Sequence, residues 1–274
     1  MSRQLTSGVL GRKEDDITVY LNSLTTPLSS NQINVLRTNI VGLKKDLNIK
    51  NLRDAFDVIL HLSSETAEGG LKNLVKRDND ATAVNGCVHT PYVGYNGDGA
   101  TKYVDMNYIP ATDGVNWKLT SASLGVFKQE NETGVFYDMG GYVGNIDRTF
   151  IVPRLNSAGN IRLAINGGDV FQYTPPEGTN PNSIALYSNH KIGSLNTIMY
   201  RNDVEMYNEI RTVGELSTQS IFVCGVNNNG SLLTAAPSTK QLGLSFAGRG
   251  FSASEMVYVS YWFNKLVAET KALL

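Results

Sequence analysis

The chain has 274 residues and a mass of 29.9 kDa, which suits one large domain or a mid-sized domain with an appendage. Its 24 Lys and Arg residues balance 25 Asp and Glu residues, so the net charge of −1 provides no basic surface for nucleic acid. The composition is 41% hydrophobic with 26 glycines, which excludes a disordered chain and is typical of a turn-rich one. No apolar run is long enough to span a membrane and the first residues lack a signal-peptide core, so we expect neither membrane insertion nor export by that route.

Residues 1–52 differ in pattern from the rest and are predicted to form an N-terminal anchor and oligomerisation segment. A short alternating run, Ile17–Leu21, favours a strand. After helix-start signals at Pro27 and Ser29, apolar residues recur at the 3-4-3-4 spacing of a coiled-coil seam, namely Ile33, Leu36, Ile40, Leu43 and Leu47. Two interpretations are open: this apolar stripe packs on its own domain, or it joins two or three copies of the chain.

Residues 53–274 have the pattern of a mainly β domain. Asn-Gly and Asp-Gly dipeptides, which suit tight hairpin turns, separate short runs of aromatic and β-branched residues. The runs are Phe56–Leu62, Ser121–Phe127, Phe150–Val152, Ile161–Ile165, Ile184–Tyr187, Thr197–Tyr200, Ile221–Val226 and Leu242–Phe246. They predict an antiparallel β-sandwich or jelly roll. A capping box at Ser252–Glu255, followed by an apolar face, predicts a C-terminal helix.

Few residues are grouped in a way that indicates catalysis. Asp203 and Glu205 would share one face of a strand, as a glycosidase pair could, but a solvated hairpin face is the favoured explanation. The sequence has neither a Gly-x-Ser-x-Gly nucleophile turn nor a phosphate loop. Its three histidines and two cysteines are scattered, so we expect no metal site, no cofactor and no enzymatic activity. Cys87 and Cys224 are expected to be buried free thiols, with a disulfide as the alternative.

Sugar binding is harder to exclude than catalysis. Platforms for sugars combine an exposed aromatic ring with Asn or Asp side chains, and Trp117 beside Asn116 has that composition in a predicted loop. Tyr142, Asn227 and Asn228 are further candidates for glycan binding. The favoured explanation is that Trp117 covers the sandwich edge and the asparagines form turns, because large aromatic side chains are usually buried.

Seven segments of the sequence resemble those of a known family. They are Leu52–Val58, Leu71–Leu74, Ala81–Asn85, Gly94–Gly99, Tyr103–Asp105, Ser121–Val126 and Phe246–Glu255. The series resembles the concanavalin-like (laminin-G-like) sandwich domains of structural proteins in tailed bacteriophages, including fibre, tail and head-decoration proteins. The resemblance covers residues 52–274 and implies a fold and a setting rather than an activity. Related sandwiches include lectins that bind sugar through calcium, but no loop of this chain matches such a calcium site.

The resemblance implies a non-enzymatic structural protein of a phage virion, most simply a head fibre or capsid decoration protein made in the host cytoplasm. Residues 1–50 would attach the chain to the capsid or another virion protein and form a dimer or trimer. The sandwich would project outward and bind surface glycans, using several weak contacts on one particle. The alternative is a carbohydrate-binding or carbohydrate-cleaving host-adsorption protein of the tail, with Asp203, Glu205 or Trp117 in its site.

Overall fold

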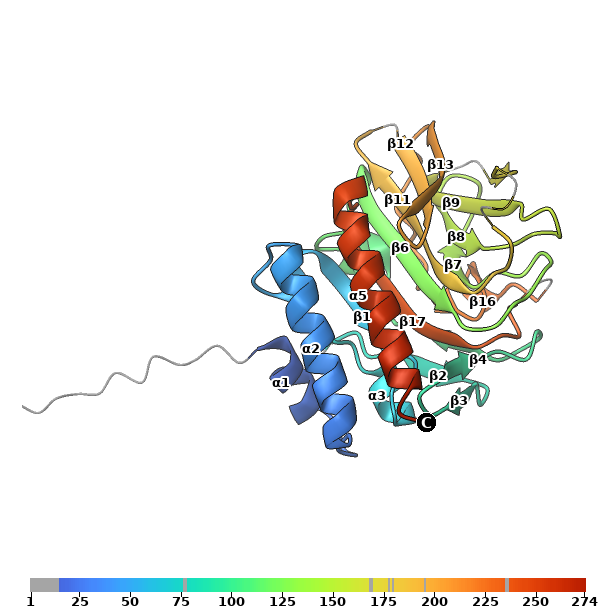
Figure 1. The fold of residues 1–274 in the computed structure, drawn as a ribbon. Helices are drawn as coiled ribbons and strands as arrows, with labels where there is room; N and C mark the ends of the chain where they lie inside the picture. Colours follow the sequence, from blue (N-terminus) through green and yellow to red (C-terminus); the bar gives the residue numbers. More distant parts are fainter. Residues whose placement is uncertain are drawn as a thin grey trace, which may run out of the picture.

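The computed structural model describes residues 15–75, 78–167, 170–176, 178, 180–194, 196–234 and 237–274. Within these ranges two largely antiparallel sheets face each other, and a layer of helices covers the outer face of one sheet (Figure 1). This arrangement confirms the predicted mainly β sandwich with a C-terminal helix.

The first sheet has eight strands in the order β13-β12-β11-β6-β17-β4-β3, with β1 paired to β17. Its strands are β1 Phe56–Leu60, β3 Val88–Thr90, β4 Gly94–Asn96, β6 Ser121–Lys128, β11 Ala185–Ile192, β12 Asn196–Arg201, β13 Val204–Ile210 and β17 Leu242–Gly248. The longest pairing joins β6 and β11 in unbroken register from Ala185 opposite Lys128 to Ile192 opposite Ser121. Strands far apart in the chain are neighbours here, so the sheet depends on long-range contacts.

The second sheet has nine strands in the order β10-β9-β8-β7-β14-β5-β2, with β15 beside β7 and β16 beside β15. Its strands are β2 Thr82–Val84, β5 Tyr103–Asp105, β7 Met139–Tyr142, β8 Arg148–Val152, β9 Ile161–Gly167, β10 Phe171–Tyr173, β14 Phe222–Val223, β15 Asn227–Asn228 and β16 Ser231–Leu232. The β15–β16 hairpin turns at Asn229 and Gly230, where φ is 51° and 86°. This is the conformation for which Asn-Gly was expected.

Five helices and one short 3-10 turn are described: α1 Asp16–Asn22, α2 Ser30–Asp46, η1 Leu52–Asp54, α3 Ala67–Leu71, α4 Pro110–Asp113 and α5 Ala253–Lys271. Helix α5 begins with the predicted capping box, in which Ser252 and Glu255 each accept a hydrogen bond from the other's backbone N–H. Helix α1 occupies residues for which a strand was predicted, so that prediction was wrong. The Asp15 carboxylate accepts from the N–H groups of Ile17 and Thr18, and this cap stabilises a helical turn.

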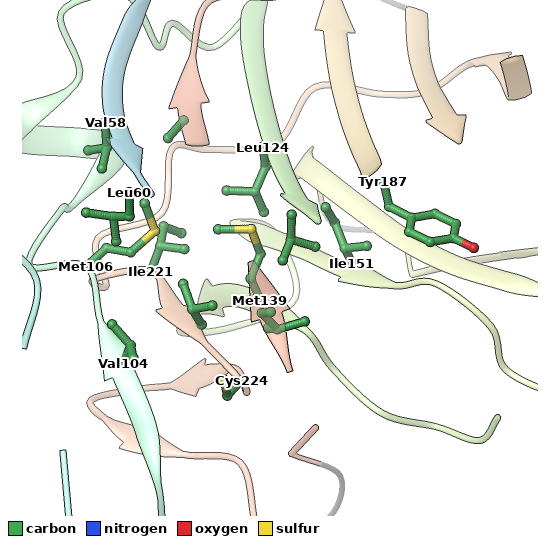
Figure 2. Packing of buried hydrophobic residues seen from close by; sticks show 14 of the residues in the cluster. Val58, Leu60, Val104, Met106, Leu124, Met139, Ile151, Tyr187, Ile221 and Cys224 are labelled. Carbon is green, nitrogen blue, oxygen red and sulfur yellow. The ribbon is translucent and has the colours of Figure 1, made fainter. Parts of the chain in front are cut away.

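The core between the two sheets is apolar and completely enclosed. Figure 2 shows strands from both sheets contributing to it, with Leu124 on β6, Met139 on β7 and Ile151 on β8 close together. Burial of apolar surface at about 25 cal/mol per Å² is the main stabilising contribution of such a core. The strand alternation that sends these residues inward sends their neighbours to the outer faces.

A second core lies between the first sheet and the helices, and the apolar stripe of α2 belongs to it. Leu36, Ile40, Leu43 and Leu47 are at most 7% exposed, and Ile33 packs against the same cluster. Helix α2 lies beside α5 over the sheet (Figure 1). The stripe is therefore covered by its own chain, as in the first of the two interpretations. The prediction that these five side chains join copies of the chain is corrected, because they pack against their own sheet and helices.

The second core also spans the boundary expected at residue 52. Leu43 of α2, Phe56 of β1 and Phe263 of α5 are fully buried members of one cluster. Residues 15–52 and 53–274 thus share a hydrophobic core in the part of the chain that the structure describes. The start of the N-terminal segment, residues 1–14, lies outside the described residues.

Candidate functional site

Trp117 lies inside the protein, where its ring has no face open to a sugar. It is 0% exposed, its indole N–H donates to Asn166 Oδ1 at 2.8 Å, and its backbone N–H donates to the buried Asp57 carboxylate at 2.9 Å. Asn116 is also engaged, since its side-chain amide donates to the carbonyl oxygens of Arg53 and Phe56. The prediction of these two residues as a glycan platform is corrected: they join the loop before β6 to the strands around it.

Tyr142 and Asn228 come together although they are far apart in the sequence. They are register partners in the β7–β15 ladder, and the next backbone N–H, that of Asn229, donates to Tyr142 O at 2.9 Å. The Arg148 guanidinium lies 5.7 Å from the centre of the Tyr142 ring. Burial raises the pKa of the Tyr142 hydroxyl above its usual value, so this group stays a hydrogen-bond donor at neutral pH.

Asn227 has a structural role in the same ladder. It is 3% exposed, its side-chain amide donates to Ser220 O at 2.9 Å, and its Oδ1 accepts from Gly230 N–H at 2.8 Å. Both ends of its amide are used in holding the β15–β16 hairpin. Of the five candidates for glycan binding, the structure therefore leaves Tyr142 and Asn228 together and places the other three in structural contacts.

A separate hollow of about 310 Å³ lies between α5 and the turn that joins β12 to β13. We call it the α5 pocket; its lining residues are Asn202, Asp203, Val257, Ser260, Tyr261 and Asn264. The four residues from α5 recur at helical spacing and therefore line one side of the hollow. The opposite side is fixed because Asn202 exchanges hydrogen bonds with the backbone of Leu186 on β11.

The lining of the α5 pocket combines an aromatic ring with several hydrogen-bonding groups. Tyr261 is 55% exposed, and its ring packs edge-on against Trp262 with 4.9 Å between ring centres, which holds it in place. Ser260 is 2% exposed, and its Oγ has no hydrogen-bond partner among the described residues. Because that oxygen is buried, the exposed Tyr261 ring is the part of this wall that is open to a ligand.

Asp203 and Asn264 complete the polar part of the α5 pocket. The Asn264 side-chain amide donates to Ser260 O at 2.7 Å, and this residue lines the pocket. Asp203 is exposed in the turn before β13, and no salt bridge involves it in the described ranges. Glu205 does not line the pocket. It lies on β13, where its carboxylate accepts a hydrogen bond from the Asn208 side chain at 3.2 Å.

The sequence predicted a C-terminal helix from its capping box and apolar face, and this pattern did not indicate the α5 pocket on the other side of the helix. A signal was present: Tyr258 and Tyr261 fall outside the helical face formed by Met256, Val259 and Phe263. Aromatic rings placed off the apolar face of a helix are expected on its outer surface. Their partner across the pocket, the β12–β13 turn, follows only from the fold.

Two further buried carboxylates, those of Glu132 and Asp138, form salt bridges with the same lysine. Lys128 Nζ is 2.6 Å from both Glu132 Oε2 and Asp138 Oδ1, and all three side chains are buried. In the part of the chain that the structure describes, no group of three or more His, Cys, Asp or Glu side chains is arranged to hold a metal ion. Within the same ranges, no helix has the length and apolar character needed to cross a bilayer.

No protein-family model and no curated protein matches the chain. Among solved structures, the fold is similar to that of Trypanosoma rangeli sialidase in complex with 2,3-difluorosialic acid, a covalent intermediate. The TM-score is 0.54 at 11% identity, over 85% of this chain and 40% of the sialidase chain. The same sialidase in complex with sialic acid gives 0.53 at 12% identity, over 85% and 39%. A mutant of HCR/D gives 0.51 at 9% identity, over 76% and 52%.

These similarities concern the fold alone, because identity is near one position in ten. The chain spans about 40% of the length of the sialidases, so more than half of each sialidase lies outside the similarity. The expectation that this chain is not an enzyme is nevertheless corrected: the same fold occurs within sialidase chains and gives no reason to exclude an enzymatic role. The chain is a β-sandwich of a kind consistent with the concanavalin-like architecture.

Proposed function

We propose that this protein binds glycans, and that the α5 pocket holds one sugar unit. The observation that carries the proposal is the combination in that hollow of an exposed aromatic ring, Tyr261, with an exposed carboxylate, Asp203, and the side chain of Asn264. Sites for small ligands combine apolar or aromatic walls with a few polar groups that fix orientation. Sandwich chains with this fold include proteins solved with sialic acid, which supports a sugar as the ligand class.

A pyranose ring presents C–H groups on its faces and hydroxyl groups at its rim. The Tyr261 ring would pack against one such face, which suits an aromatic side chain held by a neighbouring ring. Asp203 would accept hydrogen bonds from the rim hydroxyls, and the Asn264 side chain would provide a further polar contact. The hollow is open and holds about 310 Å³, so a single site would bind weakly.

The proposed setting is the virion of a tailed bacteriophage, as a head fibre or capsid decoration protein; the alternative is a tail protein for host adsorption. The support for this setting is the sequence resemblance over residues 52–274. Residues 1–50 would contact the capsid or another virion protein, and association into a dimer or trimer would use a surface other than the buried stripe of α2. Multiple copies on one particle would turn weak sugar contacts into firm attachment.

The glycan proposal is tested by screening the purified chain on a glycan array together with three single variants. Tyr261→Ala removes the aromatic wall of the α5 pocket, and Tyr142→Ala removes the ring of the sequence-predicted cluster. Tyr258→Ala is the matched control, because this tyrosine is 42% exposed on the same helix and does not line the pocket. We expect the wild-type protein and the last two variants to bind a common set of glycans, and Tyr261→Ala to lose at least about tenfold in affinity, equal to roughly 1.4 kcal/mol.

Two results would overturn parts of this proposal separately. If Tyr142→Ala loses binding while Tyr261→Ala keeps it, the sugar binds at the β7–β15 ladder and the α5 pocket is the wrong site. If the wild-type protein binds no glycan on the array, glycan binding itself is wrong. The setting has its own test: peptides of this chain should be found by mass spectrometry in purified phage particles from a culture that expresses it, and their absence would contradict a virion role.

A further inference from the structure

The two cysteines of the chain, Cys87 and Cys224, lie side by side in the fold. Cys87 Sγ contacts Asn96 O at 3.2 Å and Cys224 Sγ contacts Tyr95 O at 3.7 Å, so both thiols face consecutive carbonyl groups of β4. Interaction with the Cys87 thiol is the largest of the causes that raise the pKa of the Cys224 thiol, as expected for two neighbouring thiols. Figure 2 shows Cys224 at the margin of the core between the sheets. The sequence has two cysteines, and they are 137 positions apart, so chance alone would seldom place them together in the fold.

The backbone on both sides of the pair is fixed by other contacts. Cys224 has a φ of 64°, which a non-glycine residue rarely adopts, and its N–H donates to Asp138 O at 2.8 Å. Cys87 follows the Asn85-Gly86 turn, and its N–H donates to Val84 O at 3.1 Å. The thiols are thus held in contact by the fold rather than by chance side-chain rotation. Their approach joins the turn between β2 and β3 to the end of β14.

We propose that Cys87 and Cys224 are a dithiol pair that closes into an intramolecular disulfide when the protein meets a small-molecule disulfide such as oxidised glutathione. This inference is independent of glycan binding. In the first step a cysteine thiolate attacks one glutathione sulfur, the glutathione S–S bond breaks, and one glutathione thiolate leaves with its electron pair. In the second step the other cysteine thiolate attacks the mixed disulfide and displaces the second glutathione. Two protons pass to the two glutathione thiolates, so the protein loses two hydrogens and two reduced glutathiones form.

The positions of the two thiols set the order of attack. Cys87 is 7% exposed in a turn, whereas Cys224 is 0% exposed beneath it. The interaction with the Cys87 thiol, together with burial, raises the pKa of the Cys224 thiol well above its usual value, which lowers its thiolate fraction. Cys87 is therefore the thiol that attacks the oxidant, and Cys224 is the one that resolves the mixed disulfide.

The disulfide would link the β2–β3 turn, which passes from the second sheet to the first, to the end of β14 in the second sheet. A cross-link between residues so distant in sequence restricts the unfolded chain strongly, and stabilisation by a disulfide increases with the length of the closed loop. The oxidised protein should therefore unfold at a higher temperature than the reduced one. A protein made under reducing conditions and released outside the cell would gain this stabilisation after release.

The test is to incubate the full chain with oxidised glutathione just below its unfolding temperature and then to alkylate it in denaturant. We expect both cysteines to escape alkylation, a monomeric product that has lost two hydrogens, and an unfolding midpoint raised by roughly 5–10 °C that dithiothreitol reverses. Cys224→Ser should stop at the mixed disulfide with one glutathione on Cys87, with no comparable rise in the midpoint. Cys87→Ser should react more slowly than Cys224→Ser.

The proposal is wrong if both thiols are still alkylated after this treatment, or if the oxidised product is a disulfide-linked dimer. It is also wrong if the single variants show the same rise in midpoint as the wild-type protein. Since glycan binding is measured on a separate array, a failure here leaves the proposed function untouched, and the reverse also holds.

Discussion

At the scale of single residues, the histidines show how the fold determines protonation. His61 and His190 are completely buried, and burial lowers the pKa of each imidazole to about 3. The charge of Glu255 opposes this at His190 only in part. His190 Nδ1 accepts a hydrogen bond from Phe251 N–H at 3.4 Å, which requires the ring to be unprotonated at that atom. The sequence showed three scattered histidines and gave no sign that two of them would be buried as neutral side chains.

We expect the free energy of unfolding to fall as the pH is lowered from about 6.5 towards about 3. In this window the unfolded chain binds protons at His61 and His190 that the folded chain does not bind, so acid favours unfolding by up to roughly 5 kcal/mol per histidine. Urea unfolding of the wild-type protein and of His190→Gln at several pH values measures the effect. The variant should have a shallower pH dependence, while His89→Gln, at a half-buried position, should change it less. Equal slopes for wild type and His190→Gln would contradict this assignment.

At the scale of elements, the contact between α2 and α5 depends on one glycine. A Cβ atom at Gly42 would lie 2.3 Å from the Trp262 ring, so the missing side chain provides the space for the indole. The Trp262 indole N–H then donates to Asp46 at 2.8 Å and fixes the two helices together. The sequence could not predict this role of Gly42, because spacing along one helix does not identify the side chains of its neighbour.

We expect Gly42→Ala to reduce the free energy of unfolding by about 1–3 kcal/mol, because the added methyl group overpacks against Trp262. Helix propensity acts in the opposite direction, because alanine is favoured over glycine in a helix by about 1 kcal/mol. A stabilised variant would therefore contradict this expectation and show that the Trp262 ring moves aside easily. Chemical denaturation gives the value. Gly144→Ala is the control, since a Cβ there meets nothing within 4 Å and the change should be within about 0.5 kcal/mol of zero.

At the scale of the whole molecule, local patterns predicted the sandwich but not which of its parts would meet. Asn229-Gly230 and the Ser252–Glu255 box indicated their turn and helix correctly, because each depends on neighbours in the sequence. The stripe from Leu36 to Leu47 showed an apolar face without identifying its partner, which is its own sandwich. For the same reason the burial of Trp117, the meeting of Tyr142 with Asn228 and the α5 pocket required the structure.

One consequence of the shared second core is that the sandwich should not fold properly without α2. A chain lacking residues 1–50 loses the side chains that cover Phe263, Leu266 and their neighbours, so we expect it to aggregate or to unfold without a sharp transition. A chain that begins at Asp15 keeps α1 and α2 and serves as the control. Size-exclusion chromatography and thermal melts followed by circular dichroism compare the two. A soluble, cooperatively folding chain that begins at residue 51 would contradict the shared core.

The central claim, that a sugar binds in the α5 pocket, is tested most directly by NMR with a glycan selected from the array. The side-chain amide of Asn264 lines that pocket, whereas Asn228 lies on the β7–β15 ladder of the other sheet. On titration we predict a saturable shift of the Asn264 side-chain signals, with those of Asn228 unchanged. A shift at Asn228 with none at Asn264 would contradict the account.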